Sequence, residues 1–427
     1  MATAYSGAAI DLQVTRDGRI CDAVNGQYVT ITRTGRKYGI SSVTGKLDSV
    51  GDNRLFPEKY ANGGFWTAIE ESRQNYLLNS GMNVGSGGLA TSWTRSSSMT
   101  PNSPVQSLDA DCIEGAYSQR FQVTQGNVTS ITSFMYQSTV PASFAAGDLV
   151  AGSIWVKDDS AAGAVGIRMV LKVFNASSGV VTQVFSATAT RGAGWVKLTA
   201  TLTAGAATDF AQISVLPVNT PVTGDVFDVR IDAAQLEKGA FATSYIPTTT
   251  TAVTRPADVV TFPSTSLVAA NGTFAAVVGG STTLGNSRRV LSLSPVTGNV
   301  RRMELLITAT GTGGGCVGGD DGANVYPYGG VNPTSASWTV AMKWSGTVAS
   351  ATTNGAVWTD LATDATTTLP SDPLYCGSAH AYGNFLNAPV HRLVAFTTAL
   401  SNAEILDLSN RMLAGIPKRH YYSTFGG

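Results

Sequence analysis

Short runs in which apolar and polar residues alternate recur along most of the chain. In the segment 195–202, Val196, Leu198 and Leu202 fall on one face of an extended strand. The stretch 175–179 contains a glycine and separates two further β-prone runs, as a hairpin loop does. Many short strands at near-regular spacing, with turn residues between them, predict an all-β chain built from antiparallel β-sandwiches.

Changes in this pattern divide the chain into four parts. Residues 1–68 alternate short β-like runs with glycine-marked turns, which predicts a small β-region that serves as an N-terminal attachment region. Residues 69–246 form the clearest sandwich unit. Residues 247–263 are rich in Pro and Thr, which predicts an extended linker because Pro removes ladder donors. The β-pattern resumes in residues 264–427 and predicts a second sandwich.

The segment 402–413 carries the one helical pattern in the chain. Ser401 is the expected N-cap, and Glu404 three residues later completes a capping box. Leu400 and Ile405 occupy the positions of a hydrophobic staple. A short C-terminal helix should therefore pack on the second sandwich, since its apolar residues share one face. The residues expected on that face are Ile405, Leu408 and Met412.

Charge and hydropathy narrow the possible partners. Lys plus Arg equals Asp plus Glu at 28 each, so the charge balance gives no reason to expect binding to nucleic acid or to an anionic membrane. No apolar run reaches the roughly 20 residues of a membrane helix, so membrane insertion is not expected. The N-terminus lacks the basic and apolar regions of a secretory signal. The chain is therefore expected to be made and kept in the cytoplasm unless another route releases it.

The candidate catalytic residues do not form a recognisable motif. The histidines are dispersed and no GxSxG sequence is present, so the chain is not expected to be an enzyme. The cysteines are scattered without CxxC spacing, which favours small buried apolar residues over a metal cluster. Glycoside hydrolysis needs only two carboxylates across a sugar, and folding could bring such a pair together. A polysaccharide depolymerase therefore remains as an alternative.

Carboxylate oxygens are the ligands that calcium prefers, and acidic residues are dense in two places. One group comprises Asp225, Asp228, Asp232 and Glu237. The other is the pair Asp320 and Asp321 in a glycine-rich stretch, and this pair is the predicted metal site. The alternatives are surface charges in the first case and a plain connecting loop in the second. No other cofactor is expected.

Four aromatic residues are candidates for stacking on a sugar ring. Tyr326 and Tyr328 follow the glycine-rich stretch, where the backbone can approach a ligand closely. Trp358 and Trp93 lie in loose, polar sequence, whereas the other tryptophans lie in β-like runs typical of a core. These four residues are the predicted ligand-binding residues, and core packing is the alternative for each tryptophan.

Two segments near the ends of residues 69–246 resemble a known module. Residues 69–81 (IEESRQNYLLNSG) resemble the opening of a carbohydrate-binding-module-like jelly roll found in bacteriophage tail and minor structural proteins. Residues 233–248 (AAQLEKGAFATSYIPT) and 254–260 (TRPADVV) resemble the passage that closes it. In the last part, residues 390–408 (VHRLVAFTTALSNAEILDL) resemble the end of laminin-G-like, concanavalin-type jelly rolls.

These resemblances imply a function. They imply a non-enzymatic virion structural protein, part of a tail fibre or other tail component, that lies on the particle exterior and is released from the host cytoplasm by lysis. The implied partners are other virion proteins and host-surface glycans. Fibres and spikes of this kind imply a homo-oligomer, in particular a trimer, although no heptad or β-helix repeat requires one. A purely architectural head fibre or capsid decoration protein is the second hypothesis, and a depolymerase the third.

Overall fold

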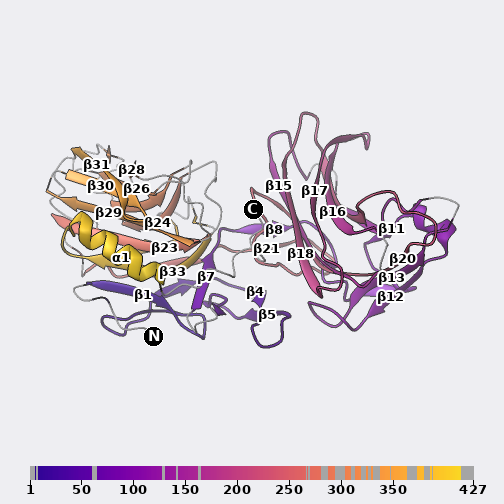
Figure 1. Cartoon of the computed structure of the whole chain (residues 1–427), viewed down its shortest axis with the longest axis horizontal. Coiled ribbons are helices and arrows are strands. Elements are labelled where there is room, and N and C mark those ends of the chain that lie inside the picture. Colours follow the sequence, from indigo (N-terminus) through magenta and orange to yellow (C-terminus); the bar gives the residue numbers. More distant parts are fainter. Residues whose placement is uncertain are drawn as a thin grey trace.

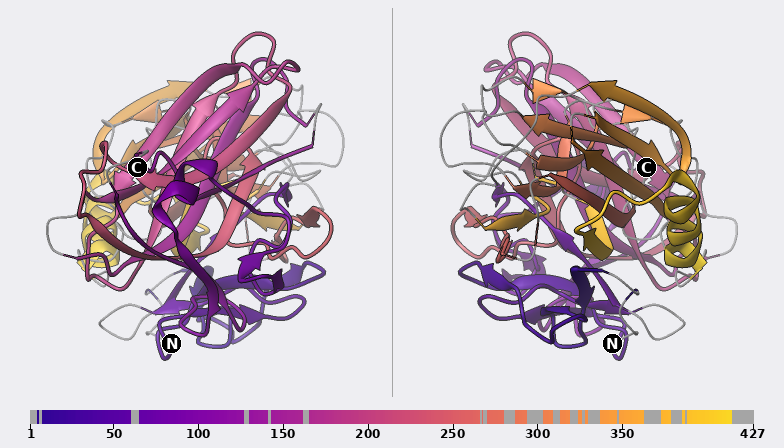
Figure 2. Two further views of the ribbon diagram at one scale, coloured as in Figure 1. Left: turned by 90° about the vertical axis from the view of Figure 1, so that its right-hand side faces the viewer. Right: turned by 90° about the vertical axis from the view of Figure 1, so that its left-hand side faces the viewer.

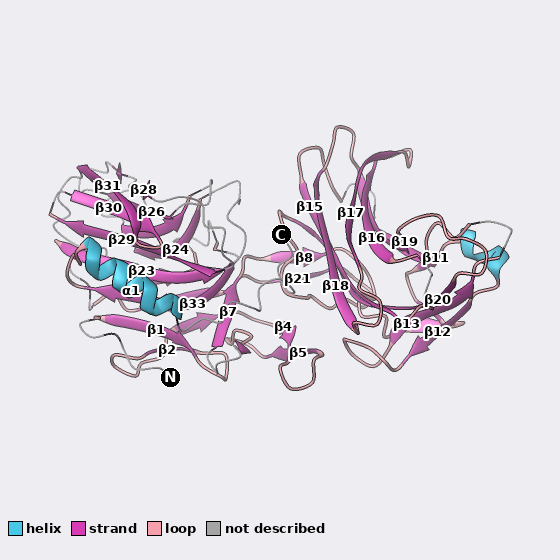
Figure 3. Ribbon diagram, viewed as in Figure 1, coloured by secondary structure: helices cyan, strands magenta, loops and turns pink. Residues whose placement is uncertain are grey.

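The computed structural model of the chain is all-β, as the sequence predicts (Figure 3). The described residues form two antiparallel β-sandwiches that lie side by side (Figure 1). Their helices are α1 (Asn402–Ala414) and the short 3-10 helix η1 (Ser97–Asn102). The structure describes residues 5, 8–59, 65–126, 130–140, 143–161, 165–265, 267, 270–279, 287–293, 303–308, 313–318, 324–325, 328–329, 337–346, 348–362, 373–378, 385–386 and 388–414.

The first sandwich combines strands from both ends of the chain. One sheet has the order β2-β1-β33-β23-β29-β30-β31, with β7 paired to β33 and β6 to β7. Its strands are β1 (Ile10–Val14), β2 (Ile20–Asp22), β6 (Glu58–Lys59), β7 (Phe65–Ile69), β23 (Asn271–Gly279), β29 (Ser337–Ser345), β30 (Val348–Thr353), β31 (Ala356–Ala362) and β33 (Ala388–Phe396).

The facing sheet of the first sandwich has the order β27-β26-β25-β24-β32-β22-β3, with β28 paired to β26. Its strands are β3 (Thr30–Thr32), β22 (Val259–Phe262), β24 (Arg288–Leu293), β25 (Met303–Ile307), β26 (Gly313–Gly318), β27 (Asn324–Val325), β28 (Tyr328–Gly329) and β32 (Leu374–Cys376). Both sheets contribute to one apolar core, in which Phe262, Phe274 and Trp338 are buried. Burial of such rings is the main term that holds two sheets together.

The N-terminal β-region forms, but it is not a separate attachment region. Strand β1 pairs with β33, with Ile10 opposite Ala395, and β3 pairs with β22, with Ile31 opposite Val260. Strand β7 also pairs with β33. The predicted boundary at residue 68 is therefore wrong, because β1, β3 and β7 complete the sheets of the C-terminal sandwich. Without them β22 and β33 would present unpaired backbone groups at a sheet edge.

The predicted linker at residues 247–263 is also incorporated into the fold. Strand β21 (Val253–Arg255) pairs with β8 (Arg73–Asn75), and β22 lies between β32 and β3. Val260 and Phe262 are buried in the core of the first sandwich. The Pro and Thr content suggested an exposed connector, but the alternation within β22 buries one face of this segment. The prediction of a linker is therefore wrong.

The second sandwich has the strand order of a jelly roll, and its strands lie inside the predicted range 69–246. We call β11-β14-β19-β16-β17 the front sheet and β12-β13-β20-β15-β18 the back sheet. From β13 onward the chain passes between them in the order back, front, back, front, front, back, front, back. The left panel of Figure 2 looks onto this sandwich.

The strands of the second sandwich and the smaller elements around it have the following bounds. The front sheet contains β11 (Thr94–Arg95), β14 (Met135–Ser138), β16 (Ile167–Phe174), β17 (Val180–Thr188) and β19 (Phe210–Pro217). The back sheet contains β12 (Val105–Asp109), β13 (Ser118–Thr124), β15 (Leu149–Asp158), β18 (Trp195–Thr203) and β20 (Val226–Lys238). Two hairpins are β4 (Lys37–Ile40) with β5 (Leu47–Val50), and β9 (Gly85–Ser86) with β10 (Leu89–Ala90).

The C-terminal helix α1 confirms the sequence prediction. The backbone N–H of Glu404 donates to Ser401 Oγ at 3.2 Å, and Glu404 Oε2 accepts from the Ser401 N–H at 2.7 Å. Ile405, Leu408 and Met412 pack on the outward side of β23, β29 and β33. The right panel of Figure 2 shows the helix beside this sheet. Within the described residues, no helix is long and apolar enough to cross a membrane.

Candidate functional site

Trp93 is the one predicted sugar-stacking residue whose side chain the structure describes. Its ring is 4% exposed in the core of the second sandwich, and its Nε1 donates to the Asn79 carbonyl oxygen at 3.2 Å. The prediction of an exposed platform is wrong, because the polar neighbours Ser92 and Thr94 face solvent while the ring turns inward. Tyr326 lies outside the described residues. Of Tyr328 and Trp358 the structure describes only the backbone, in β28 and β31.

The predicted metal site, Asp320 and Asp321, also lies outside the described residues. Within those residues, no group of three or more His, Cys, Asp or Glu side chains is placed to hold a metal ion. In the other acidic group, Asp232 accepts the N–H groups of Ile113 and Glu114 at 2.8 and 2.9 Å. It is fully buried, so it is a structural acceptor and not a surface charge.

The β4–β5 hairpin lies between the sandwiches, against the outward side of the back sheet (Figure 1). The Leu47 N–H donates to the Ile113 carbonyl at 2.9 Å, and the rings of Tyr38 and Tyr245 meet edge-on at 5.8 Å. Trp155 on β15 belongs to the same apolar cluster. Residues 1–68 therefore contact both sandwiches, through strands on one side and through this hairpin on the other.

Beside the hairpin, a group of buried charges links residues 69–81 and 233–260, which carry the sequence resemblance, to the N-terminal region. Asp258 is fully buried, accepts from Lys37 Nζ and lies 3.3 Å from Arg33 Nη1. Lys37 Nζ also lies 3.1 Å from Glu70 Oε2. Buried charges are tolerated only when paired and hydrogen-bonded, so these four side chains depend on one another.

Glu70 is the centre of this ionic cluster. Its carboxylate receives Arg255 Nη1 at 2.7 Å and both the N–H and the hydroxyl of Ser244 at 2.8 and 2.7 Å. Burial alone would raise the pKa of Glu70, but Arg255 and Lys37 hold the pKa below its ordinary value. The residues that carry the sequence resemblance therefore form a structural junction, because Glu70 comes from the opening segment and Ser244 and Arg255 from the closing ones.

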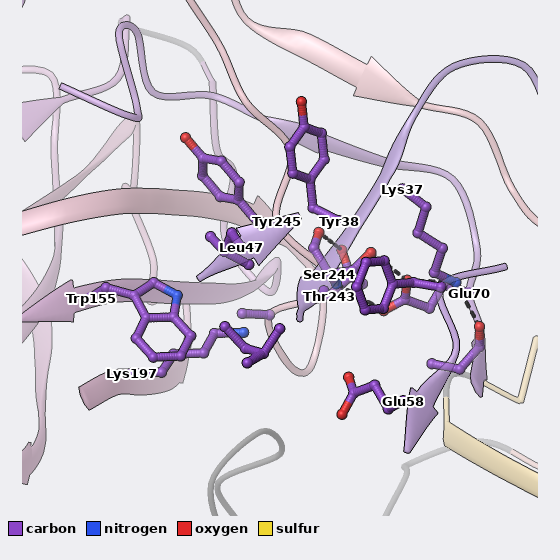
Figure 4. A pocket seen from close by; sticks show the side chains of 15 residues that line it. Lys37, Tyr38, Leu47, Glu58, Glu70, Trp155, Lys197, Thr243, Ser244 and Tyr245 are labelled. Carbon is purple, nitrogen blue, oxygen red and sulfur yellow. Dashed lines mark hydrogen bonds and ion pairs between the residues drawn. The ribbon is translucent and has the colours of Figure 1, made fainter. Parts of the chain in front are cut away.

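A cavity opens next to the junction, between the hairpin and the back sheet (Figure 4). Aromatic walls are provided by Tyr38, Trp155 and Tyr245, and charges by Glu58 and Lys197. The free volume is about 50 Å³. A water molecule requires roughly 10–15 Å³ measured in this way, so the cavity has room for a few water molecules and is too small for a sugar ring.

The carboxylates of this cavity do not make a convincing acid–base pair. Burial raises the pKa of Glu58 to about 8, opposed by Lys197, while the pKa of Glu70 is lowered. Such a divergence is typical of glycosidase acids. However, Glu70 is 1% exposed and its oxygens are bound to Lys37, Arg255 and Ser244, so it cannot reach a substrate.

The outward side of the back sheet beyond the hairpin is occupied by ion pairs. Arg120 contacts Asp228 at 2.5 Å. Arg230 and Lys157 are paired in the same way with acids of the sheet and its loops: Arg230 with Asp159 at 2.7 Å and Lys157 with Asp111 at 2.6 Å. These three cations already have partners, so this part of the back sheet offers few free groups to a ligand.

The front sheet presents a different outward surface, which we call the front face. Its residues follow from the strand register, since every second side chain points away from the core. One row across β14, β19, β16 and β17 consists of Tyr136, Ser214, Val170 and Phe185. The next row consists of Ser138, Gln212, Lys172 and Gln183. The third row consists of Phe210, Phe174 and Val180.

The front face therefore has a polar row between two rows that contain aromatic rings. Phe185 is 39% exposed, and Arg168 lies over its ring at 3.7 Å. Phe174 and Phe210 stack in parallel with their centroids 5.0 Å apart. Gln183 is exposed. Rings with amides and hydroxyls between them match a sugar, which has apolar C–H faces and a rim of hydroxyl groups.

The front face was not predicted from the sequence. The predicted sugar-stacking rings lie in loose, polar sequence, whereas Phe174 and Phe185 lie within regular strands. The available signal was an aromatic residue at an outward position of an alternating strand. Phe185 shares its face with the exposed Gln183, whereas Val184 between them packs on the core. The row itself joins residues far apart in sequence, so only the sheet register could reveal it.

Comparisons with known proteins are distant. No protein-family model and no curated protein matches the chain. The CBM40 of the Ruminococcus gnavus IT-sialidase, bound to alpha2,3 sialyllactose, gives a TM-score of 0.30 at 18% identity, over 35% of this chain and 92% of that one. The CBM22-1 xylan-binding domain of Paenibacillus barcinonensis Xyn10C gives 0.27 at 13% identity, over 41% and 98%.

A third structure is the leech intramolecular trans-sialidase, with a TM-score of 0.28 at 18% identity over 33% of this chain and 23% of that one. Carbohydrate-binding modules are thus among the structures that resemble part of this chain. At TM-scores of this size, the likeness supports no conclusion about what the chain binds.

Proposed function

We propose that this chain is a non-enzymatic carbohydrate-binding protein that holds a glycan on the front face. The observation that supports this proposal is the polar row Ser138, Gln212, Lys172 and Gln183, set between rows with aromatic rings on the outward side of the front sheet. Ser138 and Gln183 are exposed, whereas Val170 and Ser214 of the neighbouring row are buried. The back sheet is a poorer candidate, because the hairpin covers part of it and ion pairs occupy the remainder.

The rows suit an extended ligand. Residues two apart on a strand are separated by about 7 Å, so the aromatic rows lie about 14 Å apart with the polar row between them. A chain of sugars lying across the rows could stack on Phe185 and Phe174 while Gln183 and Gln212 bind its hydroxyls. Binding that relies on pre-formed strands needs little ordering of the protein, which favours affinity.

A glycan array probed with the full chain tests this function. Phe185→Ala should weaken binding about tenfold through the lost stacking surface. The matched control is Tyr117→Ala, which removes another exposed ring, 43% exposed, away from the front face. Equal effects of the two substitutions, or no binding to any glycan, would contradict the proposal.

The virion location is a second part of the proposal and rests on the sequence resemblance of residues 69–81 and 233–260. In this view the protein lies on a particle exterior, assembles with other virion proteins as a homo-oligomer and contacts host-surface glycans. Antibody against the chain should label the outside of purified particles. Label confined to unassembled protein would contradict it, and label without any glycan binding would favour a purely architectural role.

Absence of catalysis is tested separately. Incubation of the chain with host polysaccharide should release no reducing sugar. Release of sugar that is abolished by Glu58→Gln would instead identify the junction cavity as an active site and would support the depolymerase hypothesis.

A further inference from the structure

Acidic residues are distributed unequally between the two sheets of the second sandwich. The described strands of the back sheet contain five carboxylates: Asp109, Asp158, Asp228, Asp232 and Glu237. The strands of the front sheet contain no Asp or Glu, and their charged residues are Arg95, Arg168 and Lys172. The chain as a whole has no net charge, whereas the strands of the front sheet carry positive residues only.

The two cations on the front face lack acidic partners. The backbone of Lys172 pairs with Gln183 and Gln212, but its ammonium group has no ion-pair partner among the described residues. Arg168 contacts the ring of Phe185, but its Nε is buried and has no hydrogen-bond partner among the described residues. By contrast, Arg120 on the back sheet is paired with Asp228. A cation without a partner beside aromatic rings is a ready donor for an anionic ligand.

We propose that the front face selects glycans that carry carboxylate groups. This inference rests on the proposed function, and it names the class of sugar. Carboxylates form charge-assisted hydrogen bonds with guanidinium and ammonium groups, and the absence of acidic side chains on these strands removes the repulsion that such a glycan would otherwise meet. Neutral glycans would use the same rings and amides but gain nothing from Arg168 and Lys172.

The spacing of the cations indicates the form of the ligand. Arg168 and Lys172 lie on one strand, four residues apart, and both point away from the core. This separates their Cα atoms by about 13 Å along the strand. An acidic polysaccharide carries carboxylates on separate units and can therefore present one carboxylate to each cation.

Nucleic acid is the other polyanion that such a surface could attract, and it fits less well. Duplex binding draws on many phosphate contacts, typically six or more cations, whereas the front face offers two. The exposed amides and stacked rings also match sugars better than a phosphate backbone. Duplex DNA therefore serves as a comparison ligand.

Binding to polygalacturonate tests the inference, with its highly methyl-esterified form as the neutral counterpart and dextran sulfate and duplex DNA as other polyanions. The variant is Arg168→Gln with Lys172→Gln. The control is Arg16→Gln with Arg36→Gln, which removes the same charge from exposed positions elsewhere. A glycan array that contains both carboxylate-bearing and neutral glycans is probed as well, so that the result does not depend on one polymer.

The expected result is stronger binding to carboxylate-bearing than to neutral glycans, with the front-face variant weakening that binding about ten- to a hundredfold and the control leaving it unchanged. Binding of neutral glycans with no preference for acidic ones would overturn this inference and leave the proposed function standing. Equal binding to dextran sulfate or DNA would overturn it too, as generic attraction of polyanions. Failure to bind any glycan would overturn both.

Discussion

The two outward surfaces of the second sandwich are built from similar antiparallel strands but differ in how their charged residues are paired. On the back sheet, Trp155 is covered by the hairpin, and the cation Arg230 is bound to Asp159 at 2.7 Å. On the front sheet, Phe185 is exposed and the ammonium group of Lys172 has no ion-pair partner among the described residues. The charged residues of one side are engaged within the protein, and those of the other remain available.

This difference shows how to separate structural from binding charges. Both sheets contribute inward residues to one core, such as Phe227 from the back and Ile213 from the front. The contrast arises only outside the core, where residues 1–68 and the closing segment pack on the back sheet. The charged groups of the junction are fully buried and must be paired, whereas the half-buried cations of the front sheet need no internal partner.

The largest effect on stability is expected at the junction. Glu70→Ala would leave Arg255 buried without its carboxylate partner and would remove one of the two carboxylates that bind Lys37, which should lower the free energy of unfolding by about 3–5 kcal/mol. Urea unfolding followed by tryptophan fluorescence measures this. Asp407→Ala, which breaks the exposed pair with Arg411, is the control and should cost about 0.5 kcal/mol or less. Similar costs for both substitutions would mean that the buried ion pairs of the junction stabilise the fold no more than an exposed ion pair does.

A smaller effect is expected from pH. The pKa of Glu58 rises from an ordinary 4.5 to about 8 in the fold because of burial. Between these values the unfolded chain loses the proton while the folded chain keeps it, so Glu58 makes stability fall as pH rises from about 5 to 8. Glu70 acts in the opposite direction but only below its ordinary pKa. Burial also lowers the pKa of His391 from 6.5 to about 3, so this group opposes the Glu58 effect below about pH 6.5.

Thermal unfolding across that range measures the pH effect. Glu58→Gln cannot ionise, so this substitution should remove the contribution of Glu58 from the profile. The remainder comes from other buried groups, namely the carboxyls of Asp22, Glu114, Asp232 and Glu237, whose pKa values burial raises, and His391, whose pKa burial lowers. An unchanged dependence of stability on pH in the Glu58→Gln variant would show that groups other than Glu58 cause it. Glycan binding should not follow the same profile, since the front-sheet strands carry no carboxylate, histidine or cysteine.

The hairpin contact should contribute less than the junction. Leu47→Ala removes a half-buried side chain from the cluster with Trp155, which should cost about 1–2 kcal/mol, below the range for a fully buried leucine. Val43→Ala at the exposed hairpin turn is the control. Chemical denaturation distinguishes them, and a negligible cost for Leu47→Ala would show that the hairpin covers the back sheet without stabilising it.

The smallest effect on stability is expected on the front face. Phe185→Ala should change the free energy of unfolding by no more than about 0.5 kcal/mol, because exposed positions contribute little. The same denaturation experiment measures it, and a cost comparable to that of Leu47→Ala would identify Phe185 as a structural residue and remove the contrast between the two sides.

The sequence by itself determined the local features of this protein. The alternation in residues 195–202 predicted a strand of the second sandwich, and Ser401 with Glu404 predicted the start of α1, since both depend on neighbours close in the chain. The all-β class followed from many such segments. These predictions are confirmed because strand alternation and helix capping are set by residues only a few positions apart.

Only the tertiary structure decided how distant segments combine. The strand β1 joins β33 across nearly the whole chain, so the predicted attachment region became part of the last sandwich. The segment that was predicted as a linker contains β22, and the ring of Trp93 lies in the core of the second sandwich. Lys172 and Gln183 acquired their place beside Gln212 through the register of three strands. Pairing partners and burial depend on contacts between residues far apart in sequence, and no local pattern encodes them.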